Sequence, residues 1–140
     1  MTLALNGVIG GLVSITAGPE YTHLLFPILI GAIGGVLIPV SVQALDAIKV
    51  DDVVGAIPAH LICGIWGTLA VGIFYPFEGR EASFLWQVIG VVSIGAFVVV
   101  TTGLVWFILN LIGGLRPGEE DEEAGLDSTE VGVAAYPEFK

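Results

Sequence analysis

Charged side chains are scarce in this sequence, and basic ones are the scarcest: Lys and Arg together number four among 140 residues. With a net charge of −10, the chain has little with which to bind phosphates, so we expect no nucleic-acid partner. One cysteine, Cys63, permits no internal disulfide and does not indicate a redox compartment. We recognise no nucleophile–base set, metal cluster or phosphate-binding loop, which argues against an enzyme, a cofactor and a metal site.

Apolar residues are abundant instead: 55% of the chain is hydrophobic, its mean hydropathy is +0.93, and it holds 20 glycines. Eight of the 14 acidic residues follow Arg116, so the charge is separated from the apolar body. Apolar, glycine-rich segments are typical of membrane helices. We therefore predict an all-α, polytopic transmembrane helix bundle over residues 1–113 and an acidic tail over 114–140. The opening residues MTLALNG lack the basic segment of a signal peptide and are typical of a helix interior, so we expect them to lie inside a larger protein.

Four apolar helices are predicted in the bundle, at about residues 3–17, 24–45, 51–75 and 82–113. The first is shorter than the roughly 20 residues that span a bilayer, whereas the fourth would reach about 48 Å, well beyond a hydrocarbon core of about 30 Å. Gly7 and Gly11 in the first helix have the G-x-x-x-G spacing that lets two helix backbones approach closely.

The third predicted helix carries one ionisable side chain in its interior, His60. If the helix begins at Asp51, with Asp51 or Asp52 as its cap, His60 lies roughly 13 Å along the axis and near the middle of the bilayer. An ionisable group at that depth is costly, so it indicates either a functional site or a buried hydrogen bond between helices. Pro58 removes one backbone donor, so the carbonyl near Val54 needs another partner.

The helical face around His60 consists of small and apolar residues, namely Ala56, Ile57, Cys63, Gly64 and Gly67. No carboxylate lies one helical turn away, so a partner for the imidazole must come from another helix. We interpret Cys63 as a small buried thiol, and Gly64 and Gly67 as positions of close helix packing.

The few basic residues suggest an orientation in the membrane. Lys49 and Arg116 fall on the same side of an alternating path, and Arg80 falls on the other side together with two glutamates. The positive-inside rule then predicts a cytoplasmic tail.

Three runs of the sequence resemble a known family: ALNGVIGGLVSITAG, KVDDVVGAIPAHLICGIWGTLAVGIF and GLRPGEEDEEAGLDSTEVGVAAYPEF. In register over nearly all 140 residues, they are similar to the C-terminal portion of the Amt/MEP/Rh ammonium transporters of bacterial Amt type. The D-D-x-x-G-x-x-x-x-H-x-x-x-G-x-x-G pattern and the G-L-R…G-L-D…A-Y-P-E tail carry the likeness. Leu61, where many members have glycine, and Val131, where some have histidine, depart from it.

The resemblance implies a fold of eleven helices in two inverted halves, assembled as a homotrimer with one pore per subunit. This chain would supply the end of the eighth helix, the ninth to eleventh helices and the cytoplasmic tail. His60 would be the second of two pore histidines, with Ala56 and Ile57 beside it. The tail would couple the subunits and meet a PII-type signalling protein, through the motif residues Arg116, Gly125, Leu126, Asp127 and Tyr136.

The leading hypothesis is therefore ammonium transport across the cell membrane, with ammonium or ammonia and the lipid bilayer as partners. The first seven helices of the family, which hold the other pore histidine, the aromatic gate and the outer ammonium site, lie outside this sequence. The alternative is a truncated module that does not transport and has a structural or regulatory role. An upstream reading frame that encodes the missing helices would favour the first hypothesis.

Overall fold

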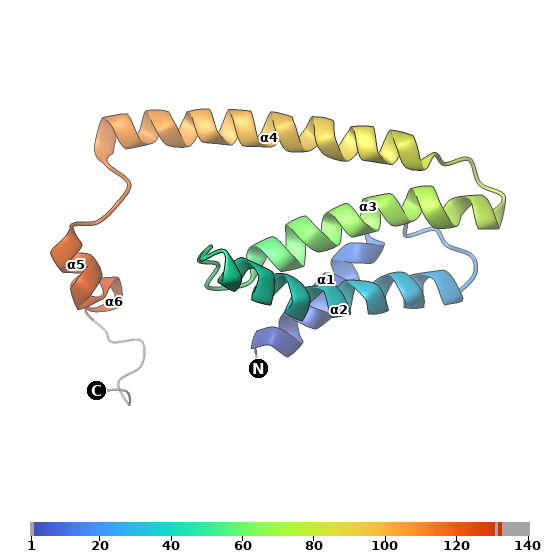
Figure 1. Ribbon diagram of the computed structural model, residues 1–140, viewed down its shortest axis with the longest axis horizontal. Helices are drawn as coiled ribbons and strands as arrows, with labels where there is room; N and C mark the ends of the chain where they lie inside the picture. The colour runs from blue at the N-terminus through green and yellow to red at the C-terminus, as the bar shows by residue number, and fades with distance from the viewer. Residues whose placement is uncertain (1, 131, 133–140) are drawn as a thin grey trace. The chain divides into compact units, whose positions relative to one another are not determined.

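All regular secondary structure among the described residues is helical. The computed structural model describes residues 2–130 and 132, and within them no strand occurs. The element order is α1 (Thr2–Ile15), α2 (Leu25–Ala47), a π-helical turn η1 (Ile57–Ile62), α3 (Cys63–Phe74), a 3₁₀ turn η2 (Tyr75–Glu78), α4 (Phe84–Gly113), α5 (Glu119–Ala124) and α6 (Leu126–Thr129) (Figure 1). The predicted all-α class is confirmed.

Three helical stretches of the described residues are long and apolar enough to cross a membrane: Leu25–Ala47, Ile57–Glu78 and Phe84–Gly113. The apolar helix Leu3–Ile15 is shorter, as its sequence predicts. Of these, Leu25–Ala47 and Ile57–Glu78 pack with α1 as a membrane helix bundle. The chain divides into two compact units, residues 1–95 and 96–140, which we describe separately.

The predicted start of the third helix is wrong. The sequence predicts a helix from Asp51, but regular structure begins only at Ala56 and Ile57. The cause is Gly55, whose φ of +72° lies in the left-handed region and turns the chain sharply before the helix starts. Residues 51–55 therefore form a turn and not the first helical turns.

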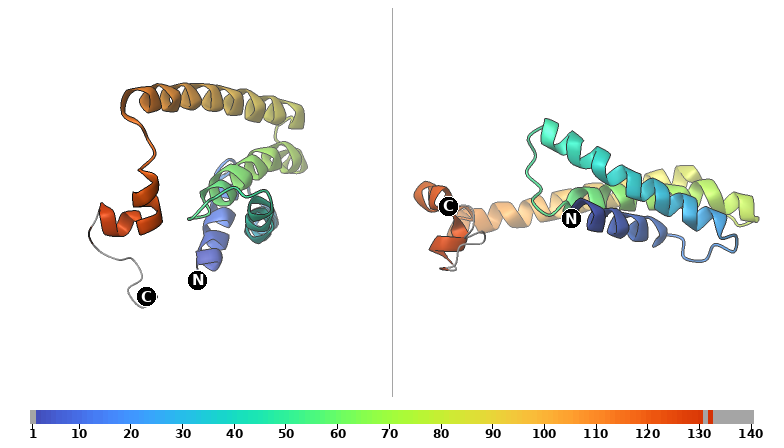
Figure 2. Two further views of the ribbon diagram at one scale, coloured as in Figure 1. Left: turned by 60° about the vertical axis from the view of Figure 1, so that its left-hand side comes forward. Right: turned by 90° about the horizontal axis from the view of Figure 1, so that it is seen from below.

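In the first unit, α1 lies against both α2 and α3, and α3 also packs on α2 (Figure 2). The α2 and α3 helices are antiparallel: the Trp66 indole Nε1–H donates to the carbonyl of Ile30 at 3.0 Å, and Cys63 Sγ lies 3.4 Å from the carbonyl oxygen of Gly34. Ile38 packs on Cys63 and Ala59 in a fully buried cluster, which agrees with the same antiparallel register.

Two pairs of glycines form the crossing of α1 and α2. A Cβ added to Gly11 would lie 3.1 Å from the carbonyl oxygen of Gly31, and one added to Gly35 would lie 3.5 Å from that of Gly7. Both helices thus place a G-x-x-x-G pair at the crossing, and only hydrogen atoms separate the two backbones. In lipid, where apolar side chains gain little from leaving the solvent, such close packing drives helix association.

The tightest point of this unit surrounds Ser14, which is 1% exposed. Its hydroxyl donates to the carbonyl of Gly10 one turn earlier at 2.7 Å. A Cβ on Gly34 would overlap that hydroxyl and lie 2.8 Å from the Gly10 carbonyl oxygen, and a Cβ on Gly67 would overlap the Ser14 carbonyl. Ser14 therefore fills the space that Gly34 of α2 and Gly67 of α3 leave open, and all three helices meet at this point.

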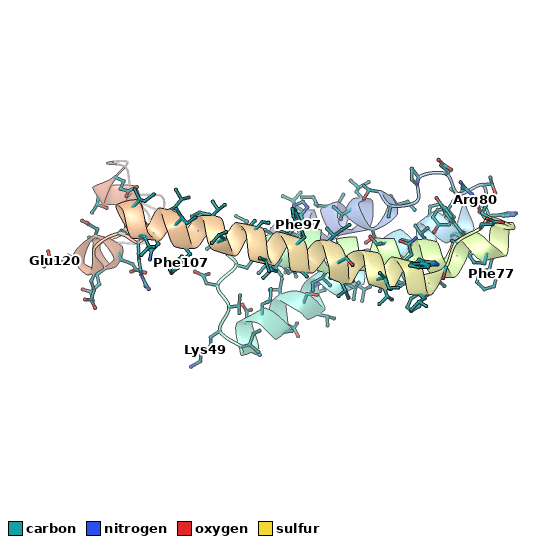
Figure 3. The ribbon with its side chains drawn as sticks, turned by 90° about the horizontal axis from the view of Figure 1, so that it is seen from above. Lys49, Phe77, Arg80, Phe97, Phe107 and Glu120 are labelled. Carbon is teal, nitrogen blue, oxygen red and sulfur yellow. The ribbon has the colours of Figure 1, made fainter. Side chains whose placement is uncertain are left out.

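Polar contacts close one end of the first unit. The Glu78 carboxylate accepts the backbone N–H groups of Thr22 (3.0 Å) and His23 (2.9 Å), which ties the α1–α2 loop to η2. Arg80 donates to the backbone carbonyl of Glu20 at 2.9 Å and forms an ion pair with its carboxylate, which raises the pKa of Arg80. Lys49 lies at the opposite end of this unit (Figure 3).

Tyr21 packs into the same closed end. Its ring meets that of Tyr75 edge-on at 4.9 Å between centroids, and its hydroxyl lies 3.4 Å from the carbonyl oxygen of Ala70. The guanidinium of Arg80 sits 4.2 Å above the centre of the Tyr75 ring. Burial, followed by the nearby Tyr75 and Glu78, raises the pKa of Tyr21 to about 12.

Helix α4 has 30 residues, close to the predicted extent, and none of them is buried; Phe97 and Phe107 are among its exposed side chains (Figure 3). Gly114, at φ +64°, ends the helix.

The acidic run Glu119–Ala124 of the tail forms the short helix α5, and all of its residues are exposed. Arg116 Nε and Nη2 donate to the two carboxylate oxygens of Glu122 at 3.0 and 2.9 Å, which lowers the pKa of Glu122 and raises that of Arg116. We also expect Gly125 to Tyr136 to fold back on cytoplasmic loops; residues 131 and 133–136 of that segment lie outside the described set, and the docking stays a prediction.

A matched pair of alanine substitutions tests the glycine crossing in the intact protein. We expect Gly34→Ala to lower the melting temperature of the detergent-purified protein by several degrees, because its Cβ has no space between Ser14 and Gly10, and overpacking of this kind costs about 1–3 kcal/mol. Gly7→Ala, at the same crossing, leaves about 4.0 Å to the nearest carbonyl oxygen and should be tolerated. Equal melting temperatures for the two variants would contradict the described packing.

Candidate functional site

The candidate site lies where the turn of residues 51–55 leads into η1 and α3. His60 is the fourth residue of η1, only about 5 Å along the axis from Ile57. The expected distance of roughly 13 Å from the helix start is therefore wrong, because the residues between Asp51 and Gly55 are not helical.

A different observation places His60 at depth. Its neighbour Ala59 packs on Ile38, which lies thirteen residues after Leu25 and nine before Ala47 in α2. At about 1.5 Å per residue, Ile38 is roughly 20 Å from one end of α2 and 14 Å from the other. Helix α2 is long enough to span a membrane. The short α3 therefore begins beside the middle of a spanning helix, and His60 lies at the same level.

His60 itself is exposed, whereas its neighbours Ala59 and Cys63 are buried against α1 and α2. The sequence predicts that Cys63 and Gly67 share the face of His60, but in the structure these two point into the helix contacts. The buried positions are Ala59, Cys63, Gly67 and Ala70. The imidazole thus lies off the packed face, on a side of α3 that the described residues leave uncovered.

Three further residues lie nearer this uncovered side, namely Ala56, Ile57 and Gly64. Ala56 is exposed and Ile57 is half-buried. A Cβ added to Gly64 would meet nothing within 4 Å among the described atoms, in contrast to Gly67. The predicted packing role of Gly64 therefore has no partner in the described part of the chain, and its lack of a side chain leaves open space one turn after His60.

Residues Ile57–Ile62 have π-helical geometry. The N–H of Cys63 reaches back to the carbonyl of Pro58, five residues earlier, so the turn is wider than an α-helical one. Pro58 falls at the start of η1, where its missing N–H costs no internal bond. Ala59 and Cys63, four residues apart, face the core, and His60 lies on the other side of the turn. Single π turns occur most often at functional sites.

Two side chains hold the turn that precedes η1. The Asp52 carboxylate accepts the N–H groups of Ala56 (2.9 Å) and Ile57 (2.8 Å), the first donors of the helix; of the two predicted caps, Asp52 makes these bonds. The carbonyl of Val54 accepts from the Asn6 amide at 2.8 Å. The Val54 carbonyl, which needs a partner because Pro58 has no N–H, is thus hydrogen-bonded to another part of the protein. This bond gives no indication of a water-filled path beside the turn.

Asn6 was not singled out from the sequence, although a polar amide in an otherwise apolar helix was a visible signal. The sequence does not show which backbone group such an amide reaches. For His60, the described residues provide no hydrogen-bond partner to the imidazole. The site is therefore an ionisable ring on a turn beside the middle of α2, with no hydrogen-bond partner among the described residues.

Three helical stretches that are long and apolar enough to cross a membrane are the feature of a polytopic membrane protein, and a turn of residues 51–55 precedes the stretch that carries His60. The model of the Ammonium Transporter Family matches residues 1–136. The chain therefore belongs to the ammonium transporter family.

Individual relatives agree with this assignment. The chain is similar to an ammonium transporter candidate of Synechocystis sp., with 38% identity over 132 residues that cover 94% of this chain and 29% of the relative. Identity to the ammonium transporter Amt1 of Haloferax mediterranei is 33% over 96% of this chain and 26% of the relative. Identity to the ammonium transporter Amt2 of Methanocaldococcus jannaschii is 34%, over 95% of this chain and 33% of the relative. The chain thus spans about a third or less of each relative's length.

Proposed function

We propose that this chain forms part of the pore of an ammonium-transporting membrane protein and that His60 lines that pore. The observation that carries the proposal is the exposed imidazole beside the middle of α2, on a face that the described residues leave open. A lone ionisable side chain at membrane depth needs either a partner or a water-filled path. Family membership and the names of the relatives supply the substrate, ammonium.

The chemistry follows from the apolar surroundings of His60. A bare cation in such a pore is disfavoured by desolvation, so ammonium gives up a proton and passes as ammonia. Neutral imidazole suits the transfer, because one ring nitrogen accepts a hydrogen bond while the other donates. The second ring comes from the part of the protein outside these 140 residues, and the two imidazoles relay the proton. Ala56 and Ile57 flank the path.

The proposed assembly is a homotrimer in the cell membrane. Helix α4 supports this proposal, because a 30-residue apolar helix without buried residues needs lipid or neighbouring helices around it. The tail carries the motif residues at which a PII-type protein would dock, including Arg116, which the Glu122 ion pair holds in place.

The proposed orientation has Arg80 outside the cell and the tail inside. Lys49 and Arg116 fall on one side of an alternating path, and positive charge favours the cytoplasm. Single cysteines replacing Phe77 or Glu123, in a cysteine-free background that includes Cys63→Ala, test this orientation. We expect a membrane-impermeant maleimide added to intact cells to label Phe77→Cys and to spare Glu123→Cys until the cells are opened. The reverse pattern would invert the assignment.

Loss of the pore imidazole is the direct test of the relay. In the full-length protein, we expect His60→Ala to abolish or strongly reduce the ammonium-evoked current in proteoliposomes, because both proton-carrying nitrogens are removed. His60→Glu keeps an ionisable group and should retain some flux with altered cation selectivity. Protein amount and trimer content are measured in each preparation.

A His60→Ala variant with native current and native selectivity would show that His60 only packs between helices. The chain would then be better described as a structural or regulatory membrane module. His23→Ala is the matched control, because it removes the other imidazole of this chain, an exposed one in the loop before α2. It should conduct like the native protein.

A further inference from the structure

Asn6 contacts the turn before η1 from a different helix. Its amide Nδ2 donates to the carbonyl of Val54 at 2.8 Å, across 48 positions of sequence, and its side chain is only 9% exposed. The amide also lies directly over Gly55, where any Cβ would overlap it. The turn therefore has a glycine at the one position that lets Asn6 reach the Val54 carbonyl.

The Val54 carbonyl has few other sources of a hydrogen bond. The residue four positions later, Pro58, has no backbone N–H to donate to this carbonyl. In an apolar environment, a backbone acceptor without a partner is costly, and the backbone moves to find one. Asn6 removes the need for such a movement.

We propose that Asn6 is a positioning residue for His60, which acts through Val54 and the turn of residues 51–55. The Asn6 amide donates to the Val54 carbonyl of the turn, and the Asp52 carboxylate accepts the N–H groups of Ala56 and Ile57. Together these bonds hold the turn and the start of η1. The π-helical turn that carries His60 starts directly after this point. Because α1 also carries the glycine crossing with α2, Asn6 places the histidine turn relative to the whole bundle. The effect on transport rests on the proposed function.

Two substitutions at Asn6 separate the effect of its hydrogen-bond donor from the effect of its side-chain volume. Asn6→Leu keeps a side chain of similar size but has no donor. Asn6→Asp keeps the shape and can donate only while its carboxyl is protonated. Burial, and the carboxylates of Asp51 and Asp52 in the facing turn, raise the pKa of the introduced carboxyl above its usual value near 4. Asn110→Asp, at an exposed position of α4, is the matched control.

The first readout does not depend on transport. In the full-length protein, amide hydrogen exchange in Asn6→Leu should rise roughly tenfold over residues 53–62, because the turn opens more often when its buried carbonyl has no donor. Exchange in Leu25–Ala47 should stay native, since the glycine crossing is untouched. Unchanged exchange over residues 53–62 would overturn the proposal.

The second readout is the ammonium-evoked current at matched trimer content. Asn6→Leu should lower it roughly tenfold, the scale of loss that follows misplacement of a reacting group. For Asn6→Asp, the current relative to native should be near one at pH about 5 and fall as pH rises to about 8, because the ionised carboxyl has no proton to donate. The ratio for Asn110→Asp should stay flat.

A flat ratio for Asn6→Asp, or native current in Asn6→Leu despite faster exchange, would contradict the positioning role. If Asn6→Leu fails to assemble, Asn6→Asp measured at both pH values on one preparation still decides between the outcomes. Native current in His60→Ala would contradict the proposed function alone, since the exchange readout tests the Asn6–Val54 contact without reference to ammonium.

Discussion

Backbone contact between glycines of α1 and α2 is the constraint on which the rest of the first unit depends. Gly7 and Gly11 face Gly35 and Gly31 with no side chain between the helices. This closeness lets Ser14 reach both α2 and α3, and it brings Asn6 within hydrogen-bond distance of the turn before η1. A separation wider by one methyl group would break both contacts. The glycines thus fix the position of the histidine without touching it.

The site combines a rigid base with an uncovered face. Asp52 and Asn6 satisfy the backbone groups of the turn, and the π-helical turn directs Ala59 inward and His60 outward. The described residues provide no hydrogen bond to the exposed imidazole, and Gly64 leaves space one turn after it. A preorganised ionisable ring facing open space suits transfer of a proton, because its orientation costs nothing at the moment of transfer.

Much of the fold could be predicted from the sequence, because apolar runs and their polar breaks set where membrane helices lie. The bounds of α2 and α4 came within about two residues, the usual uncertainty of helix ends. The start of the third helix could not be predicted, because one left-handed glycine outweighed the capping signal of Asp51 and Asp52. The face of His60 was misjudged because Cys63 and Gly67 lie within reach of two helix faces, and the sequence does not show that the one packed on α1 and α2 is the face of Ala59. Long-range contacts such as Asn6 to Val54 leave no local pattern to read.

The central claim is that His60 faces a pore at membrane depth and meets an imidazole from outside these 140 residues. An experimental density map of the intact protein in lipid nanodiscs, at a resolution that shows side chains, tests this most directly. The account predicts that a ring nitrogen of His60 lies about 2.7–3.2 Å from a nitrogen of a second histidine, along a path between the two membrane faces. A map with His60 facing lipid, or enclosed by apolar side chains without a second imidazole, would contradict it.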